Sequence, residues 1–374
     1  MSSPSALTEA PNRWLAKEAF QSLFDVLLEL GFTVVGPTID QEAIVYDQIT
    51  SVDQLPRGWT DEQGPGKYRL TRRDDDAWFG YVAGPQSWKK FLFPPQATVA
   101  TADRTADGWQ MATPADDPPK YAFLGVRACD LAAIRVQDRT FLEGPYIDPI
   151  YAARRHEALI VAVNCTQAAS TCFCTSMGTG PRVTDGFDLA LTELPEGFVV
   201  EIGSQKGADV LARIETHEAD DSSLERAAIA RQQAVDQITR RLDTHGIRDL
   251  LLGNLNHPRW NDVAERCLSC TNCTMVCPTC FCSSVNEVAD LQGDHVERQR
   301  QWDSCFNFDF SYMNGGIVRG QIRSRYRQWL THKLASWIDQ FGVSGCVGCG
   351  RCITWCPVGI DLTEEVAAIR ETSG

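Results

Sequence analysis

The sequence predicts α+β or α/β N-terminal and middle regions followed by a helical, cysteine-rich C-terminal region. Short apolar strand patterns alternate with amphipathic helix patterns in the first two thirds of the chain, and the pattern after Asn261 is helical. The last part also contains two nearly identical cysteine runs. A chain of 374 residues has room for two or three domains. The expected division is a small α/β domain at 1–100, a linker at 101–119, an α/β domain at 120–256 and a helical domain at 257–374.

Composition and charge exclude several classes of protein. With 43% hydrophobic and 22% charged residues, the chain is typical of a globular protein. No apolar run approaches the roughly 18 uncharged residues of a membrane span, and Met1 to Pro11 lacks the pattern of a secretory signal. A net charge of -14 gives no electrostatic attraction to nucleic acid or to an anionic membrane. We therefore expect a cytoplasmic protein that binds neither.

The elements expected in the first two regions follow from periodicity. Residues Asn12 to Leu30 carry apolar side chains at helical spacing and end at Gly31, which predicts an amphipathic helix. Tyr121 to Val126 and Leu159 to Val163 are continuous apolar runs, typical of buried strands. A long polar helix is expected from Ser222 to about His245. The linker is placed at 101–119 because Asp, Thr, Ala and Pro dominate that stretch.

The two cysteine runs share the spacing C-x2-C-x2-C-x3-C-P. The first consists of Cys267, Cys270, Cys273 and Cys277, and the second of Cys346, Cys349, Cys352 and Cys356. In this spacing three thiolates hold one iron–sulfur cubane, and in two-cluster ferredoxins the fourth cysteine ligates the other cluster. The rule predicts one [4Fe-4S] cluster on Cys267, Cys270, Cys273 and Cys356, and a second on Cys346, Cys349, Cys352 and Cys277.

Zinc and purely structural cysteines are the alternatives. Zinc favours paired C-x2-C knuckles with a longer gap, whereas three cysteines within seven residues suit a cubane better. The chain has fifteen cysteines and no export signal, which favours metal ligation over a disulfide framework. The quartets begin far apart, at Cys267 and Cys346, with mostly helical sequence between them. The C-terminal region therefore resembles an α-helical ferredoxin, a dicluster fold of electron-transfer subunits.

Seven cysteines lie outside the quartets. Cys129, Cys165, Cys172 and Cys174 follow strands or share a loop of the middle region, so they are a candidate third metal centre, with Asp130 as a conceivable replacement ligand. The alternative is that they are small buried residues and incidental loop thiols. The remaining three are interpreted as core residues or as thiols next to a cluster: Cys280, Cys282 and Cys305.

An apolar stripe from Ile322 to Ile338 predicts a further amphipathic helix. Its arginines lie largely off the stripe: Arg319, Arg323, Arg325 and Arg327. The simpler interpretation is a surface helix with a solvated basic face, and the alternative is a docking face for an acidic partner subunit. The residue next to Lys333, His332, is interpreted as a surface residue and not as a ligand.

Several motifs together carry a family resemblance. They are Gly125-Val126-Arg127-Ala128-Cys129-Asp130, the run from Cys172 to Pro181, Cys277-Pro278-Thr279-Cys280-Phe281-Cys282, Trp302-Asp303-Ser304-Cys305, Gly315-Gly316 and Cys346 to Cys352. In this order they resemble the β subunit of cytosolic, NAD(P)-linked nickel–iron hydrogenases, or sulfhydrogenases. They are also similar to the corresponding iron–sulfur subunit of anaerobic sulfite reductase. The sequence departs from the family at Ile317 to Gly320, where relatives have His-Asn-Phe-Arg.

The resemblance implies an iron–sulfur subunit that passes electrons between a flavin subunit handling NAD(P)H and the catalytic nickel–iron subunits. Two [4Fe-4S] clusters, and a third at the middle cysteines, would be its cofactors. The sequence shows no nickel site, flavin fingerprint or dinucleotide loop, so no catalysis by this chain alone is expected. The alternatives are the same role in a sulfite reductase complex and a metal-stabilised scaffold without redox function.

Overall fold

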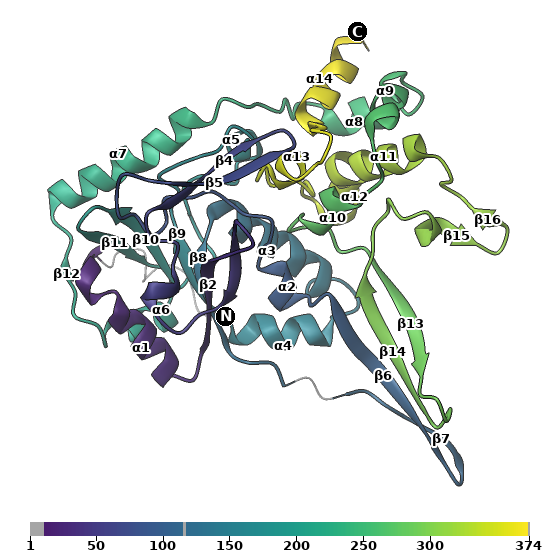
Figure 1. Ribbon diagram of the computed structural model, residues 1–374, viewed down its shortest axis with the longest axis horizontal. Coiled ribbons are helices and arrows are strands. Elements are labelled where there is room, and N and C mark those ends of the chain that lie inside the picture. Colours follow the sequence, from purple (N-terminus) through teal and green to yellow (C-terminus); the bar gives the residue numbers. More distant parts are fainter. Residues whose placement is uncertain (1–10, 115–116, 373–374) are drawn as a thin grey trace.

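The fold is organised around an eight-stranded mixed sheet (Figure 1). The structure is a computed structural model and describes residues 11–114 and 117–372. The strands, in their order across the sheet, are β12 (His217–Glu218), β1 (Arg13–Ala16), β11 (Gly197–Ile202), β10 (Leu189–Leu194), β9 (Leu159–Val163), β8 (Tyr121–Val126), β2 (Thr33–Asp40) and β3 (Ala43–Gln48).

The middle of the sheet is parallel and buried on both faces. Strands β2, β8, β9 and β10 pair in parallel, and antiparallel strands extend both edges. Strand β9 reads LIVAV, and all five residues are buried, which is typical of a strand covered on both faces. Leu159 and Val161 pack into one core, whereas Ile160 and Ala162 pack into the other, as the alternation of side chains requires. The two buried strands predicted from the sequence are thus confirmed.

Helices cover both faces of this sheet. One core contains side chains of the first and sixth helices, and the opposite core contains side chains of the second to fourth. A longer helix packs along β10 and β11. These helices are α1 (Gln21–Glu29), α6 (Gln205–Leu211), α2 (Lys89–Leu92), α3 (Ala128–Phe141), α4 (Pro149–Glu157) and α7 (Asp221–Gln237).

Two of the expected helices are shorter than the sequence indicates. The stretch from Asn12 to Leu30 begins as strand β1, in which Trp14 pairs with Val199, and only α1 is helical. The open edge of β11 offers ladder hydrogen bonds that outweigh the helical spacing of the apolar side chains. The polar helix expected from Ser222 to His245 ends at Gln237, because Ile238 leaves the helix to pack beside Cys172 and Cys174.

The first two regions are not separated as expected. Strand β2, from the region 1–100, pairs with β8 from the region 120–256, and β1 pairs with β11, so both regions share one sheet. The stretch 101–119 is not a simple linker either, because it contains most of β6 (Gln96–Thr105) and all of β7 (Gly108–Ala112). Strand pairing over long sequence separations leaves no local signal in composition, so the boundary was misplaced.

A second sheet forms an arm that extends away from the body, at the lower right of Figure 1. Its strand order is β13-β14-β6-β7, with β13 (Ser283–Ala289) and β14 (His295–Trp302) contributed by the C-terminal region. Strands β14 and β6 pair in antiparallel register, with Val296 opposite Ala102. The sequence between the two cysteine quartets is therefore not wholly helical, and the arm joins the N-terminal and C-terminal parts.

The rest of the C-terminal region is mainly helical around one core that includes Trp260, Tyr326 and Trp329. A turn of π-helix at His332–Ser336 interrupts the long amphipathic helix. Arg325, expected on a solvated basic face, is buried, and its guanidinium donates to the carbonyls of Arg319 and Gly320. The helices are α8 (Ile247–Gly253), α9 (Arg259–Arg266), α10 (Asn272–Met275), α11 (Ile322–Thr331), α12 (Trp337–Phe341), α13 (Arg351–Thr354) and α14 (Leu362–Thr372).

Short elements complete the part of the chain that the structure describes. Two small hairpins and one short helix belong to this group, together with three 3-10 turns. They are β4 (Trp59–Gly64), β5 (Lys67–Arg72), β15 (Tyr312–Met313), β16 (Gly316–Ile317), α5 (Cys174–Met177) and the turns Lys17–Ala19, Val52–Gln54 and Asp309–Ser311. Across residues 11–114 and 117–372, no helix combines the length and apolar character needed to cross a bilayer.

Candidate metal centres

The two cysteine quartets have the same backbone conformation. Ser269 and Thr271 adopt positive φ values of 51° and 69°, and the residues at the same positions of the second quartet, Gly348 and Gly350, adopt 67° and 75°. A short helix follows in each case, α10 and α13, before the last cysteine. Left-handed residues that are not glycine cost free energy and persist where the surroundings require them. Their recurrence indicates two copies of one cysteine-presenting loop.

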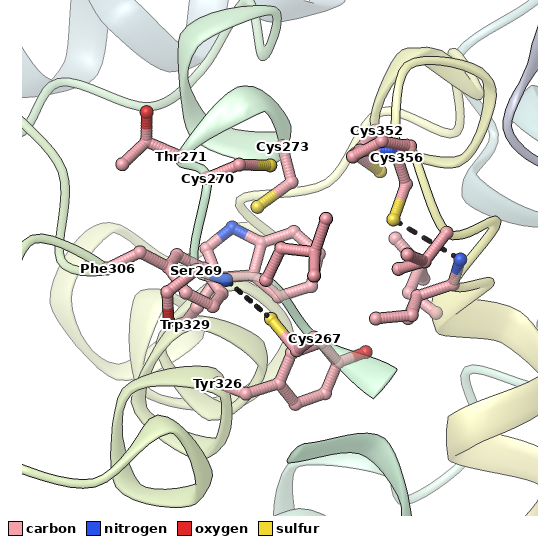
Figure 2. A pocket seen from close by; sticks show the side chains of 15 residues that line it. Cys267, Ser269, Cys270, Thr271, Cys273, Phe306, Tyr326, Trp329, Cys352 and Cys356 are labelled. Carbon is pink, nitrogen blue, oxygen red and sulfur yellow. Dashed lines mark hydrogen bonds between the residues drawn. The ribbon is translucent and has the colours of Figure 1, made fainter. Parts of the chain in front are cut away.

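The first group of predicted ligands, called centre 1, consists of Cys267, Cys270, Cys273 and Cys356. All four line one largely apolar cavity, and Figure 2 shows their sulfur atoms around it. The Sγ atoms of two of them accept backbone N–H bonds, from Ser269 to Cys267 at 3.4 Å and from Ile360 to Cys356 at 3.3 Å. Cys270 is exposed. The structure thus brings the fourth cysteine of the second quartet to the first three of the first, as ligand exchange requires.

Centre 2 consists of Cys346, Cys349, Cys352 and Cys277. These thiols lie close enough to perturb one another: the neighbours that raise the pKa of Cys352, after burial itself, are Cys346, Cys349 and Cys277. Burial raises the pKa of Cys346 to about 12. Cys352 also lines the cavity of centre 1, which places it between the two centres. Cys277 and Cys346 are both buried, so centre 2 is more enclosed than centre 1.

Centre 3 consists of Cys129, Cys165, Cys172 and Cys174, which line one cavity together with Cys349. Cys129 follows β8 and Cys165 follows β9, and the carboxyl ends of adjacent parallel strands meet at the same edge of a sheet. Burial raises the pKa of the Cys172 thiol to about 12, so a metal that binds there must displace protons. The shared contact with Cys349 places centre 3 beside centre 2.

The cysteines surround cavities and do not converge on a point. Within the described ranges, no group of three or more His, Cys, Asp or Glu side chains is arranged closely enough to hold a single metal ion. A tetrahedral zinc site needs sulfur atoms about 2.3 Å from one ion, whereas in an iron–sulfur cluster the inorganic core lies between the sulfurs. The geometry of all three centres therefore fits a multi-iron cluster better than zinc.

Asp130 does not have a free carboxylate for a metal. Arg351 binds it through two hydrogen bonds, of 2.8 and 3.1 Å, and both side chains are almost completely buried. Arg351 also donates from Nε to the carbonyl of Gly84 at 2.9 Å. The structure thus argues against Asp130 as a replacement ligand. The ion pair instead fastens the second quartet, which contains Arg351, to the helix that begins beside Cys129.

The three cysteines outside the centres lie at the base of the arm. Cys280 is hydrogen-bonded to Cys277, and a hydrogen bond from Cys305 lowers the pKa of Cys282 to about 7. The backbone there is held by the Asp303 N–H, which donates to the carbonyl of Cys282 at 2.8 Å. These thiols are therefore neighbours of centre 2, in agreement with the interpretation that they lie next to a cluster.

Sequence reasoning missed two buried lysines beside these thiols. Lys333 is 2% exposed and Lys89 is 6% exposed. The signal for Lys333 was present, because it lies between Leu330 and Trp337 on the apolar stripe of its helix, where a lysine is out of place. Lys89 had no comparable signal, since it follows Trp88 in an irregular stretch before a one-turn helix.

Comparison with known proteins agrees with the cysteine geometry. Residues 266–360 match the family model described as a 4Fe-4S dicluster domain. Sulfhydrogenase 2 subunit beta of Pyrococcus furiosus is 29% identical over 360 residues, which covers 96% of this chain and 98% of that protein. No solved structure matches. The resemblance that the motifs predict is thus confirmed: this chain is similar along almost its entire length to a sulfhydrogenase β subunit and contains a 4Fe-4S dicluster domain in its C-terminal part.

Proposed function

We propose that this protein is the iron–sulfur electron-transfer subunit of a nickel–iron hydrogenase (sulfhydrogenase) complex in the cytoplasm. It would relay electrons between a flavin subunit that handles NAD(P)H and the catalytic nickel–iron subunits. The observation that carries the proposal is the arrangement of twelve cysteines in three groups of four around adjoining cavities. The similarity to a sulfhydrogenase β subunit supports the identity of the complex.

In the proposed relay, centres 1 and 2 each hold a [4Fe-4S] cluster in an α-helical ferredoxin domain of residues 257–374. Centre 3 holds a third iron–sulfur cluster. Cys352 contacts the cavity of centre 1 and Cys349 the cavity of centre 3, which supports the order centre 1, centre 2, centre 3. The clusters supply one-electron chemistry, and the protein supplies thiolate ligands, hydrogen bonds to sulfur and burial.

The exposed Cys270 supports an exchange of electrons with a partner at centre 1. Leu268 beside it is 63% exposed, and Val358 across the cavity is 38% exposed, so apolar side chains surround the opening. Exposed apolar groups of this kind are typical of protein interfaces. Neither centre 2 nor centre 3 has an exposed cysteine among its four, so electrons would enter or leave those centres through other routes within the complex.

The proposal is tested on the complex purified anaerobically through a tag on this chain. We expect flavin and nickel to copurify and NAD(P)H to reduce the clusters, observed by electron paramagnetic resonance. Cys356→Ser should slow this reduction while leaving the partners bound. Siroheme in place of nickel would assign the chain to a sulfite reductase complex, and a chain whose metals do not respond to reductant would be a scaffold.

A further inference from the structure

Lys333 is a buried cation in direct contact with a predicted ligand of centre 2. Its Nζ donates to the Sγ of Cys277, to the Oγ1 of Thr279 and to the carbonyl of Gly345, each at 3.1 Å. Thr279 in turn donates to the carbonyl of Gly345 at 2.6 Å. The three donors of the ammonium group are thus all used, and its position is fixed.

The π-helical turn places Lys333 in this position. Residues His332–Ser336 form a single π turn between α11 and α12, and such turns occur often at functional sites. In this turn Lys333, Leu334 and Ala335 are all buried, so the lysine points into the domain with its apolar neighbours. An uninterrupted helix of the same sequence would change the direction of every side chain after the turn.

A second buried lysine lies on the same side. The Nζ of Lys89 donates to the carbonyl of Cys280 at 3.1 Å and lies 3.9 Å from the centre of the Trp302 ring. In the part of the chain that the structure describes, no carboxylate lies within ion-pair distance of either lysine. The charges nearest to Lys89 and Lys333 are those of the cysteines, led by Cys280 for Lys89 and Cys277 for Lys333.

Two buried cations without carboxylate partners need an anion, because an isolated buried charge is strongly unfavourable. A cluster with four thiolate ligands has a net negative charge, and reduction adds one more. A nearby fixed cation therefore stabilises the reduced state more than the oxidised state. Net charge and hydrogen bonds to the sulfurs are among the factors that set cluster potentials.

Centre 1 has no equivalent. The sulfurs of Cys267 and Cys356 accept hydrogen bonds from backbone amides of the described chain. Arg325 is near Cys267, but it donates to Ser269 Oγ and to backbone carbonyls, and none of its bonds reaches a cysteine sulfur in the described residues. The two centres with the same ligand spacing thus differ in the charge that contacts them.

We propose that Lys333, assisted by Lys89, raises the reduction potential of centre 2 above that of centre 1, so that electrons collect at centre 2. This inference rests on the proposed function, because it requires iron–sulfur clusters at both centres. Lys333 acts here through the sulfur of Cys277 and through its charge, without touching any substrate.

The test is a redox titration of the full-length protein, followed by electron paramagnetic resonance. In Lys333→Met, we expect the equilibrium constant for reduction of centre 2 to fall at least tenfold, a shift of about 59 mV to lower potential for a one-electron couple. Centre 1 should shift less. Lys333→Arg should keep most of the wild-type potential, and Lys89→Met should cause a smaller shift in the same direction.

Lys206→Met is the matched control, because Lys206 is exposed and bonds only to the carbonyl of His156 in the described residues. It should leave both potentials unchanged. An unshifted centre 2 in Lys333→Met with wild-type iron content would overturn the proposal, as would equal shifts of both centres. If Lys333→Met loses the cluster, Lys89→Met decides by the same criterion. A wild-type protein without any iron–sulfur signal would instead refute the proposed function.

Discussion

The first and second cysteine quartets share a backbone and differ in their surroundings. In the first quartet Leu268 and Cys270 face solvent. In the second quartet Val347 and Arg351 are buried, and a Cβ on Gly350 would lie 2.4 Å from the carbonyl oxygen of Thr171. The middle region therefore packs directly on the second loop and leaves the first open.

This difference shows which properties depend on the motif and which on the rest of the chain. The spacing of the cysteines sets the local turn and brings three thiols to one side. Solvent access, buried charge and hydrogen bonds to sulfur come from elements distant in sequence, and these factors tune a bound cluster. Two centres with the same ligand pattern are thus expected to behave as an exposed and an enclosed redox site.

The largest expected effect is the selective loss of one centre. Cys356→Ser should remove the signal of centre 1, and Cys277→Ser that of centre 2, each with a loss of about four iron atoms per chain. The reason is that each fourth cysteine lies with the other quartet. Iron analysis and electron paramagnetic resonance of the two variants check this. Loss of the centre 2 signal alone in Cys356→Ser would contradict the crossed assignment.

A similar loss is expected in the middle region. Cys172→Ser should lower the iron content from about twelve to about eight per chain, while the signals of centres 1 and 2 remain. Cys305→Ser is a matched control, because Cys305 contacts Cys282 and lies outside the cavity of centre 3. An unchanged iron content in Cys172→Ser would mean that the four middle thiols hold no cluster.

The next effect compares one position in both quartets. Arg351→Met leaves the buried Asp130 carboxylate without its partner, and breaking a buried pair costs about 3–5 kcal/mol. Asn272 occupies the same position of the first quartet, is exposed, and donates one hydrogen bond to the carbonyl of Trp355. Asn272→Ala should therefore cost about 1 kcal/mol or less. Urea unfolding of both variants under anaerobic conditions measures the difference, and similar costs would refute the comparison.

A smaller effect is expected from the left-handed residues. Gly350→Ala introduces a side chain at φ +75°, which costs about 1–2 kcal/mol, and the clash with Thr171 adds to this cost. The corresponding Thr271→Gly relieves a left-handed threonine and should be neutral or stabilising. Unfolding midpoints of the two variants, compared with wild type, provide the measurement. A destabilised Thr271→Gly beside a neutral Gly350→Ala would reverse the comparison.

The parts of the fold that local patterns predict are those with strong local signals. The continuous apolar runs of β8 and β9, the stop at Gly31 and the repeated cysteine spacing were all evident in the sequence, and φ at Gly31 is +79°. The candidate site followed from the same spacing, since the rule for the fourth cysteine predicts which thiols come together.

The parts that could not be predicted depend on contacts between distant segments. Strand β1 forms because β11 offers an open edge, and the arm forms because β14 pairs with β6 from far upstream. The buried lysines are of the same kind, since Lys89 and Lys333 meet only when the N-terminal and C-terminal parts pack together. Periodicity describes one segment at a time and has no information on such partners.

The most direct measurement is the metal and sulfide content of the anaerobically purified protein, together with its electron paramagnetic resonance spectrum after reduction. Three cubanes predict about twelve iron atoms and as many acid-labile sulfides per chain, with a reduced spectrum from interacting clusters. Zinc without an iron–sulfur signal would contradict the account.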